Sequence, residues 1–195
     1  IVRVQGMIEA QEKAQVAALV PGALDSVFVD EGSLVRQGQE LFQTDKANLE
    51  TRVEIEKQNL KVADASVEEA KAGLRQAAAS HEKAALDRDR FERLYENDKA
   101  ISKDAYEKIT SLYKQTAAGL DHAKAVLDLT LARKEQATSA VRIAEKQLAD
   151  SRVTAPFAGV VSSRLIEPGE FAGSGVAVIS LKGVSSFEAR AHVAA

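Results

Sequence analysis

Two sets of glycines with identical spacing restrict the fold of this chain more than any other feature of its sequence. Gly22, Gly32 and Gly38 form the first set, and Gly159, Gly169 and Gly175 repeat their spacing 137 positions later. Apolar residues also correspond at this offset, in the pairs Leu24 and Val161, Val29 and Ile166, Leu34 and Phe171, and Leu41 and Val178. Short apolar segments separated by glycine turns are typical of β-strands. The sequence therefore predicts one small β domain that is encoded in two separate halves.

The segment between the two halves has a different character, because it is poor in glycine and rich in alanine and charge. Apolar residues recur in it at heptad spacing. The first series contains Leu60, Val67 and Leu74 with Ala63, Ala70, Ala77, Ala84 and Phe91, and the second contains Tyr106, Tyr113, Leu120, Leu127, Val141 and Leu148 with Ile109, Ala123, Ala137 and Ala144. Two consecutive helices of similar length can bury such seams against each other. We therefore expect an antiparallel coiled-coil hairpin with helices at about 46–96 and 103–149.

Polar residues interrupt both seams of the expected hairpin. They are His81 and Arg88 in the first helix and Lys134, Thr116 and Thr130 in the second. One interpretation is loose local packing, with the long side chains reaching out to solvent. The other is that these positions contact neighbouring hairpins in an assembly. The sequence leaves both interpretations open.

The predicted fold class is α+β: a split biotinyl/lipoyl-like β-sandwich interrupted by a long helical hairpin, with fragments of an adjoining β-barrel domain. Val2 and Val4 near the start, and the alternating stretch from Ser186 to Val193, supply the expected barrel fragments. The chain starts with Ile1 and not Met, so we expect it to be a piece of a longer protein. The expected domains are a barrel strand at 1–13, a first half-module at 14–45, the hairpin at 46–150, a second half-module at 151–182, and the start of the barrel at 183–195.

Composition argues against several classes of function. A net charge of −3 gives no basic surface for nucleic acid, so no nucleic-acid partner is expected. The chain has no Cys and a single Met, and its three His residues are not at metal-ligand spacing. The glycines do not form a P-loop or a dinucleotide-binding fingerprint. We therefore predict that the protein is not an enzyme and has no catalytic, cofactor or metal site.

One sequence pattern makes the β halves more specific. The stretch from Ala155 to Val161 reads A-P-F-x-G-V-V, and P-G-E follows at 168–170. Together with the order of the segments, these motifs resemble bacterial periplasmic adaptors, the membrane fusion proteins of tripartite efflux pumps. The resemblance implies a periplasmic adaptor, anchored by a part outside this chain, that joins an inner-membrane transporter of the RND or ABC type to a TolC-like outer-membrane channel. It also implies export of drugs or other substrates, and self-association into a ring of three or six copies.

The end of the hairpin carries a second family feature. Adaptors of this kind resemble one another in an Arg-x3-Leu-x6-Ser pattern at the tip, which engages the channel. Arg90, Leu94, Ile101 and Ser102 are the matching residues here, although the gap from Leu94 to Ser102 is one residue longer than the pattern. Counting back from Ser102 instead places Tyr95 and Phe91 at the Leu and Arg positions. The alternative function for the apolar pair is closure of the coil end. Ser102, followed by Asp104, is also the expected N-cap of the second helix.

A competing motif lies where the first half-module meets the hairpin. Thr44-Asp45-Lys46-Ala47 resembles the turn at which lipoyl carriers receive their cofactor on lysine, so a carrier modified on Lys46 is one alternative function. In a carrier, however, the second half follows this turn closely. Here it begins more than a hundred positions later, so we expect Asp45 to cap the first helix instead. A purely structural coiled-coil spacer is the remaining alternative.

Overall fold

A computed structural model describes residues 5–10, 12–96, 99–184 and 187–192. Val2, Val4, Ser186 and Val193, which the sequence analysis named, lie outside these residues. The chain divides into two compact units. One combines the residues up to Glu54 with those from Ile143 on, and the other is Ile55–Arg142. The predicted α+β fold class is confirmed.

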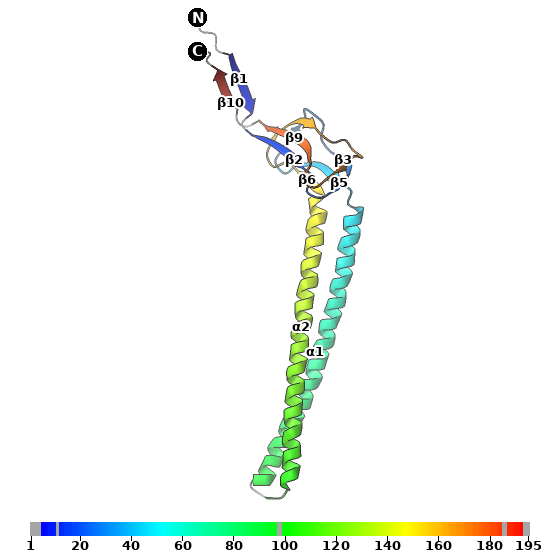
Figure 1. The fold of residues 1–195 in the computed structure, drawn as a ribbon, viewed down its shortest axis with the longest axis vertical. Coiled ribbons are helices and arrows are strands. Elements are labelled where there is room, and N and C mark those ends of the chain that lie inside the picture. The colour runs from blue at the N-terminus through cyan, green and yellow to red at the C-terminus, as the bar shows by residue number, and fades with distance from the viewer. Residues whose placement is uncertain (1–4, 11, 97–98, 185–186, 193–195) are drawn as a thin grey trace. The chain divides into compact units, whose positions relative to one another are not determined.

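The β unit contains two four-stranded antiparallel sheets, and each takes strands from both halves of the repeat (Figure 1). The first sheet has the order β2-β9-β7-β4 and the second has the order β6-β5-β3-β8. The first-half strands are β2 (Lys13–Ala17), β3 (Gly22–Val27), β4 (Leu34–Val35) and β5 (Glu40–Thr44). Those of the second half are β6 (Arg152–Thr154), β7 (Gly159–Arg164), β8 (Phe171–Ala172) and β9 (Ala177–Gly183). Neither half can form its sheets without the other.

Backbone hydrogen bonds repeat the 137-residue symmetry of the sequence. The N–H of Gly38 donates to the carbonyl of Ala155, and the N–H of Gly175 donates to the carbonyl of Ala18, both at 2.8 Å. Likewise, Leu24 N–H donates to Glu170 O at 2.8 Å, and Val161 N–H donates to Ser33 O at 3.0 Å. In each pair of bonds, the donor of one bond lies 137 positions from the donor of the other, and the same holds for the acceptors. One bond thus runs from the first half to the second, and its counterpart runs from the second half to the first. The sandwich therefore has an internal pseudo-two-fold symmetry that matches the repeat in the glycine spacing.

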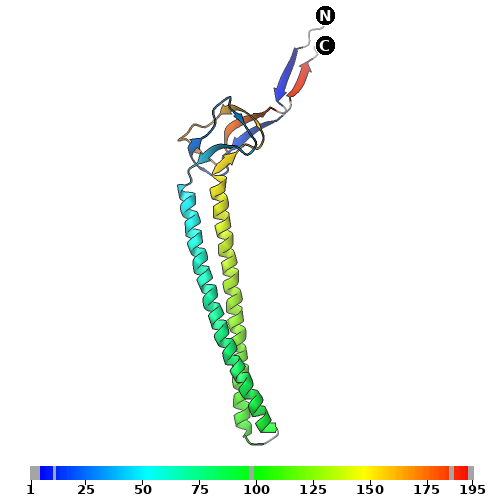
Figure 2. The ribbon, with the colours of Figure 1, turned by 180° about the vertical axis from the view of Figure 1, so that it is seen from behind.

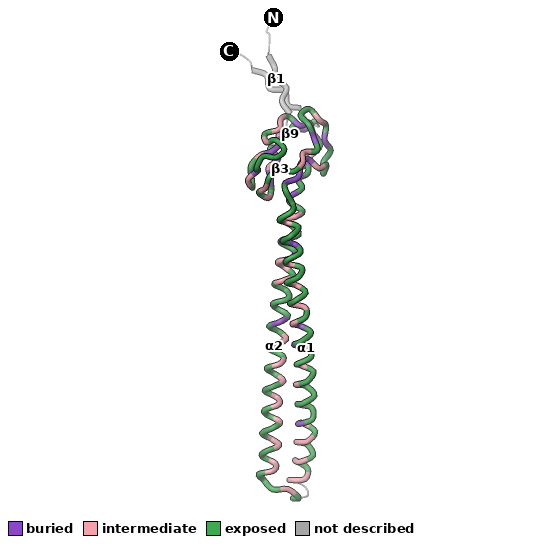
Figure 3. Tube along the Cα trace, turned by 90° about the vertical axis from the view of Figure 1, so that its right-hand side faces the viewer, coloured by how far each residue is buried: buried purple, intermediate pink, exposed green. Residues whose placement is uncertain are grey.

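The core of the sandwich is built from both halves. Its largest fully buried side chains are Phe42, Leu24, Leu41, Ile179, Leu181, Val161 and Val178. Figure 3 shows most of the buried residues gathered in these strands, whereas the helices carry mainly half-buried and exposed residues. Two of the corresponding apolar pairs, Leu24 with Val161 and Leu41 with Val178, lie in this core. The pair Leu34 and Phe171 instead faces solvent, at 72% and 73% exposure.

Glycine is required at the repeated positions for two different structural reasons. Gly32, Gly38, Gly169 and Gly175 all have φ between 79° and 90°, a conformation that other residues adopt only with strain. Gly159 is required by a close approach, since a Cβ there would lie 2.4 Å from the carbonyl oxygen of Lys182. Gly22 has room for a Cβ at an ordinary contact distance. Four of the six glycines therefore form turns, and one allows two strands to pair closely.

A separate two-stranded sheet pairs the two ends of the described chain. Strands β1 (Gln5–Ala10) and β10 (Phe187–His192) run antiparallel, with Gln5 opposite His192 and Ala10 opposite Phe187. These strands occupy the segments expected to belong to the adjoining barrel domain.

Two long helices form the hairpin: α1 (Ala47–Glu96) and α2 (Lys103–Asp150). They lie side by side in both views of the ribbon (Figures 1 and 2). The predicted seams are the more buried positions of both helices, with Val67, Ala70 and Ala84 buried on α1 and Val141 and Ala144 buried on α2. Alanine brings the helix axes close together but removes little apolar surface from water. The seam therefore stabilises the hairpin only modestly per heptad.

Candidate functional site

The hairpin tip contains the four residues that the sequence analysis proposed as the channel-binding site. Leu94 and Ile101 are both half-buried, and the N–H of Ala100 donates to the carbonyl of Leu94 at 2.9 Å. Arg90 is 66% exposed, and its guanidinium lies 3.8 Å from the carboxylate of Asp87. The tip therefore combines a partly covered apolar pair with a largely exposed cation one helical turn away.

Ser102 has a definite local role at the tip. Its Oγ accepts a hydrogen bond from the N–H of Ala105 at 3.2 Å, which confirms the expected N-cap of α2. The carbonyl of Ser102 accepts from the N–H of Tyr106 at 3.2 Å. Asp104, in the first turn, lies 2.8 Å from the Nζ of Lys108. This serine therefore has a structural reason to be at the tip, independent of any partner.

An aromatic pair closes the end of the coil, and the sequence analysis did not recognise it. The rings of Tyr95 and Tyr106 stack with their centroids 5.0 Å apart and an interplanar angle of 4°. Tyr106 belonged to the predicted seam of α2, and Tyr95 continues the heptad spacing of Leu60, Val67 and Leu74. Extending that series to the last turn of α1 would have identified the pair. Tyr95 and Tyr106 therefore take part in closing the end of the coil, beside the half-buried Leu94 and Ile101.

The polar seam residues contact one another between the two helices. His81 Nδ1 lies 3.3 Å from the hydroxyl oxygen of Thr116, and the His81 ring lies 4.8 Å from that of Tyr113. The guanidinium of Arg88 lies 4.4 Å from the centroid of the same tyrosine ring, within the range of a cation–π interaction. The hydrogen bond from Arg88 to the Asp89 carboxylate, followed by their charge attraction, raises the pKa of the guanidinium. Loose packing does not describe this part of the seam.

A second polar contact joins the helices further along the hairpin. Lys134 Nζ lies 2.8 Å from the carboxylate of Asp64, and both side chains are about half exposed, at 45% and 48%. The hydrogen bond to Asp64 and its negative charge raise the pKa of Lys134. Here the expectation that the long side chain extends toward solvent is correct, since the amine reaches the hairpin surface and pairs there.

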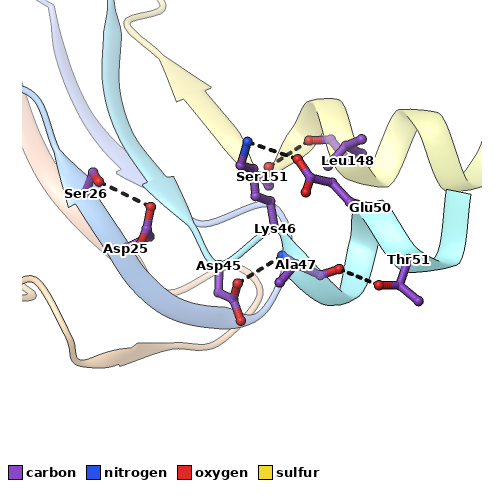
Figure 4. A network of polar contacts seen from close by, with 9 residues as sticks. All are labelled: Asp25, Ser26, Asp45, Lys46, Ala47, Glu50, Thr51, Leu148 and Ser151. Atoms are coloured by element: carbon purple, nitrogen blue, oxygen red, sulfur yellow. Dashed lines mark hydrogen bonds and ion pairs between the residues drawn. The ribbon is translucent and has the colours of Figure 1, made fainter. Parts of the chain in front are cut away.

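Lys46, the alternative modification site, lies directly before α1 (Figure 4). The carboxylate of Asp45 accepts a hydrogen bond from the N–H of Ala47 at 3.0 Å, so the predicted helix cap is confirmed. Lys46 Nζ lies 2.9 Å from the carboxylate of Glu50. A lipoyl lysine requires a tight exposed hairpin between two strands, whereas Lys46 connects a strand to a helix of 50 residues.

Within the described part of the chain, no group of three or more His, Asp or Glu side chains is arranged to hold a metal ion. Neither α1 nor α2 contains a stretch apolar enough to cross a lipid bilayer.

The sandwich split by a helical hairpin places the chain in the barrel-sandwich class of folds. The family model described as the RND MFP barrel-sandwich hybrid domain matches residues 12–180. The chain therefore belongs to the membrane fusion protein family of efflux systems. Proteins of this family are associated with the cell envelope and work with transporters and outer-membrane channels.

The curated relatives are longer than this chain and differ from it at most of the aligned positions. It is 28% identical over 200 residues to a 36 kDa antigen of Helicobacter pylori strain 26695, a match that covers 90% of the chain and 60% of the antigen. It is 30% identical over 197 residues to a UPF0194 membrane protein of Enterobacter sp. strain 638, covering 89% of the chain and 60% of that protein. The chain thus spans about three fifths of the length of these relatives.

Solved structures show the same fold. MacA from Actinobacillus actinomycetemcomitans superposes with a TM-score of 0.65 at 25% identity, over 96% of this chain and 54% of MacA. A membrane fusion protein from Streptococcus pneumoniae R6 superposes with a TM-score of 0.53 at 15% identity, over 97% of this chain and 66% of that protein.

Proposed function

We propose that this protein is the periplasmic adaptor of a tripartite pump, linking an inner-membrane transporter to a TolC-like outer-membrane channel for export of drugs or other substrates. Membership of the membrane fusion protein family is the observation that carries this proposal. The transporter is of the RND or ABC type. Copies of the chain form a ring of three or six, which a part outside this chain anchors to the inner membrane.

The channel-binding site in this proposal is the hairpin tip, formed by Arg90, Leu94, Ile101 and Ser102. An exposed guanidinium beside a partly covered apolar pair can enter a groove between two partner helices, where the cation meets carboxylates or helix C-termini. Leu94 and Ile101 each retain exposed surface in the described structure, so a partner has apolar area left to bury. Ser102 holds the first turn of α2 in place, and its contribution to binding is positional.

Site-specific photocrosslinking in cells tests this proposal. A photoreactive amino acid replaces Lys103, which is 76% exposed beside the tip, in a strain that produces the candidate channel. The matched control carries the same amino acid at Ser162, which is exposed on β7. We expect a channel adduct from position 103 and none from position 162. Adducts from position 162 alone would contradict the assignment of the tip as the binding site.

Two other measurements separate the alternatives. A lipoyl carrier would show an added lipoyl mass on Lys46 in intact-protein mass spectrometry, and we expect the unmodified mass. A purely structural spacer could be deleted without loss of export, whereas we expect deletion to abolish resistance to the exported compounds.

A further inference from the structure

The sandwich is open along one side, where the edge strands of its two sheets line a common cleft. Strand β2 is the edge of the first sheet, and β6 is the edge of the second. A cleft of about 380 Å³ is lined by residues of both strands. Among the described residues, no backbone hydrogen bond joins β2 to β6. We call this space the edge cleft.

Equivalent residues of the two halves form the two walls of the edge cleft. Gln15 of β2 and Arg152 of β6 are 137 positions apart, as are Ala17 and Thr154, and all four line the cleft. The pseudo-two-fold symmetry of the sandwich therefore relates one wall to the other.

The backbone of β2 presents hydrogen-bonding groups to the edge cleft. In an antiparallel edge strand, the main-chain groups of alternate residues face the neighbouring strand, and those of the residues between them face the free edge. The carbonyl of Glu12 and the N–H of Ala18 both bond toward β9, which assigns the even-numbered residues of this segment to the ladder. Gln15 and Ala17 therefore direct their N–H and carbonyl groups to the free edge.

The same alternation holds for β6 on the opposite wall. The carbonyl of Ser151 and the N–H of Ala155 both bond toward β5. The main-chain groups of Arg152 and Thr154 consequently face the edge cleft. Two unfilled rows of backbone donors and acceptors thus border one space.

The side chains at these two edges leave the backbone accessible. Natural proteins commonly protect a free edge with charged residues or proline. Neither β2 nor β6 contains proline, and Gln15, Ala17 and Thr154 are uncharged. The guanidinium of Arg152 lies 2.8 Å from the carboxylate of Glu40, so its charge is already paired. These edges therefore lack the usual protection against a further strand.

The apolar lining of the edge cleft restricts what can enter it. Val16 and Val153, at 8% and 5% exposure, belong to the core and also line the cleft. Leu19, which is 57% exposed, lines it as well. A chain that lies between the two strands would place alternate side chains against these apolar residues and the others toward solvent.

We infer that the edge cleft binds an extended segment of another protein, which inserts as a strand between β2 and β6. One edge of the segment bonds to Gln15 and Ala17, and its other edge bonds to Arg152 and Thr154. Since β2 has five residues and β6 has three, the paired part of the segment is about three to five residues long. Its side chains are uncharged, and those that face the core are apolar.

The sheet topology argues that the segment comes from another protein and not from a second copy of this chain. A strand that inserts between two edges needs both of its own edges free. Within the described ranges, every strand of the chain already pairs with at least one neighbour. A second copy could supply such a strand only by unpairing one of its own sheets. The inference goes beyond the adaptor function, because binding in the edge cleft requires neither the transporter nor the channel.

Peptide binding to the complete chain tests the inference. The probe is a fluorescein-labelled heptapeptide of alternating threonine and valine, and the control peptide has the same composition with the valines grouped at one end. Fluorescence anisotropy should show saturable binding of the alternating peptide and at least tenfold weaker binding of the control. Absence of saturable binding by the alternating peptide would overturn the inference.

N-methylation of the probe distinguishes insertion from addition to a single edge. One methylated peptide loses the N–H groups of its odd-numbered residues and the other loses those of its even-numbered residues, so each lacks the donors of one edge. An inserted strand uses both edges, and we therefore expect both peptides to bind about tenfold or more weakly than the probe. Weaker binding by only one of them would overturn insertion.

Proline variants of the chain remove a donor from each wall. Gln15→Pro and Thr154→Pro delete N–H groups that face the edge cleft, and leave the bonds to β9 and β5 in place. Gln15→Ala and Thr154→Ala are the matched controls, because they change the side chain and keep the N–H. Circular dichroism verifies that each variant is folded. We expect each proline variant to bind the probe about tenfold or more weakly, and the alanine variants to bind it like the unchanged chain. Equal binding by the proline and alanine variants would contradict the backbone contacts.

Hydrogen exchange of the unchanged chain gives a readout that needs no variant. We expect the amides of Gln15 and Thr154 to exchange about tenfold or more slowly when the probe is bound. The amides of Val16 and Val153, which face the neighbouring strands, should change little. Protection on one wall only, or on neither, would overturn the inference.

Sedimentation velocity of the chain without peptide tests the other occupant. We expect self-association to be the same for Gln15→Pro and Gln15→Ala. If the proline variant alone loses self-association, a second copy fills the edge cleft and its assignment to another protein is wrong. All of these measurements use the chain without the channel, so they are independent of the crosslink expected from position 103.

Discussion

Asp30 and Glu167 occupy equivalent positions in the two halves of the sandwich, and a single guanidinium pairs with both of them. Arg164 lies 2.8 Å from the carboxylate of Glu167 and 3.7 Å from that of Asp30. Each carboxylate belongs to the turn that precedes an edge strand, β4 or β8. The Nε of Arg164 is buried and has no hydrogen-bond partner among the described residues. Arg164 therefore joins the two symmetry-related turns.

We expect Arg164→Ala to destabilise the β unit by about 1 kcal/mol, since it removes a partly buried ion pair and the packing of the side-chain stem. Asp30→Ala is the control and should change stability little, because its side chain is 92% exposed. Hydrogen exchange of the Leu24 and Val161 amides in increasing urea measures the effect. Equal losses for both variants would mean that Asp30 and not Glu167 is the important partner.

Gly159 tests the close approach of β7 to β9. Because a Cβ at this position would lie 2.4 Å from the backbone oxygen of Lys182, Gly159→Ala requires a shift of the main chain. We expect a loss of about 1–3 kcal/mol in the free energy of unfolding. Gly22→Ala is the matched control, since the nearest atom to its Cβ lies at 3.5 Å. Chemical denaturation of the two variants compares them directly. A similar stability for both would show that the strands separate without cost.

The sequence predicted the split sandwich because glycine spacing reports directly on backbone conformation. Four glycines with positive φ recur at fixed offsets, so the turns that join the strands could be located without knowledge of side-chain packing. Heptad spacing likewise identified both helices, since 3.5-residue periodicity requires a partner helix. The glycine turns and the heptad seams could be predicted because each depends on the residues of one short segment of the chain.

Features that depend on pairing between distant residues were missed. The stack of Tyr95 on Tyr106 and the contact of His81 with Thr116 depend on the register of α1 against α2, which periodicity alone does not fix. The corresponding apolar pair Leu34 and Phe171 lies on the surface because each precedes the core residue of a two-residue edge strand. The outward direction of these two side chains depends on the strand register, which the sequence repeat does not show.

The contact of His81 with Tyr113 and Thr116 should fix the register of the alanine-rich seam. Alanines at successive heptads pack almost equally well after a shift of one heptad, whereas the polar cluster matches only in one register. We expect Tyr113→Ala to destabilise the hairpin by about 1–2 kcal/mol, because the Arg88 and His81 contacts to the ring are both lost. Tyr113→Phe should have little effect, since the ring remains. Thermal unfolding followed by circular dichroism measures both. A large loss with phenylalanine would show that the hydroxyl matters more than the ring.

Stability of the hairpin should depend on pH at both ends of the range. The hydrogen bond and charge of Lys71 lower the pKa of Glu68 below its usual 4.5, so the contribution of this carboxylate is present above that pH and is lost as the pH falls further. The hydrogen bond to Asp64 raises the pKa of Lys134 above 10.5, so its contribution is present below that pH and is lost as the pH rises through the raised value. Thermal unfolding of the unchanged chain and of Lys134→Met across pH compares these contributions. We expect the variant to lack the alkaline decrease while keeping the acidic one. If the variant loses as much stability at alkaline pH as the unchanged chain does, groups other than Lys134 cause that loss.

Lys99 tests whether the tip is held in a strained conformation. Its φ of 49° is positive, and it is the only residue other than glycine with positive φ in the described part of the chain. Lysine adopts this left-handed conformation at a cost, while glycine adopts it freely. We expect Lys99→Gly to leave the hairpin unchanged or to stabilise it by up to about 1 kcal/mol, and Lys99→Val to destabilise it, because a β-branched residue disfavours positive φ. Lys103→Val is the control for loss of an exposed lysine near the same turn. Thermal unfolding of the three variants measures the difference, and a stable valine variant would mean that the turn rearranges without cost. Ala100 directly follows Lys99, and its N–H donates to the carbonyl of Leu94. A rearranged turn would therefore also move Leu94 and weaken the proposed contact with the channel.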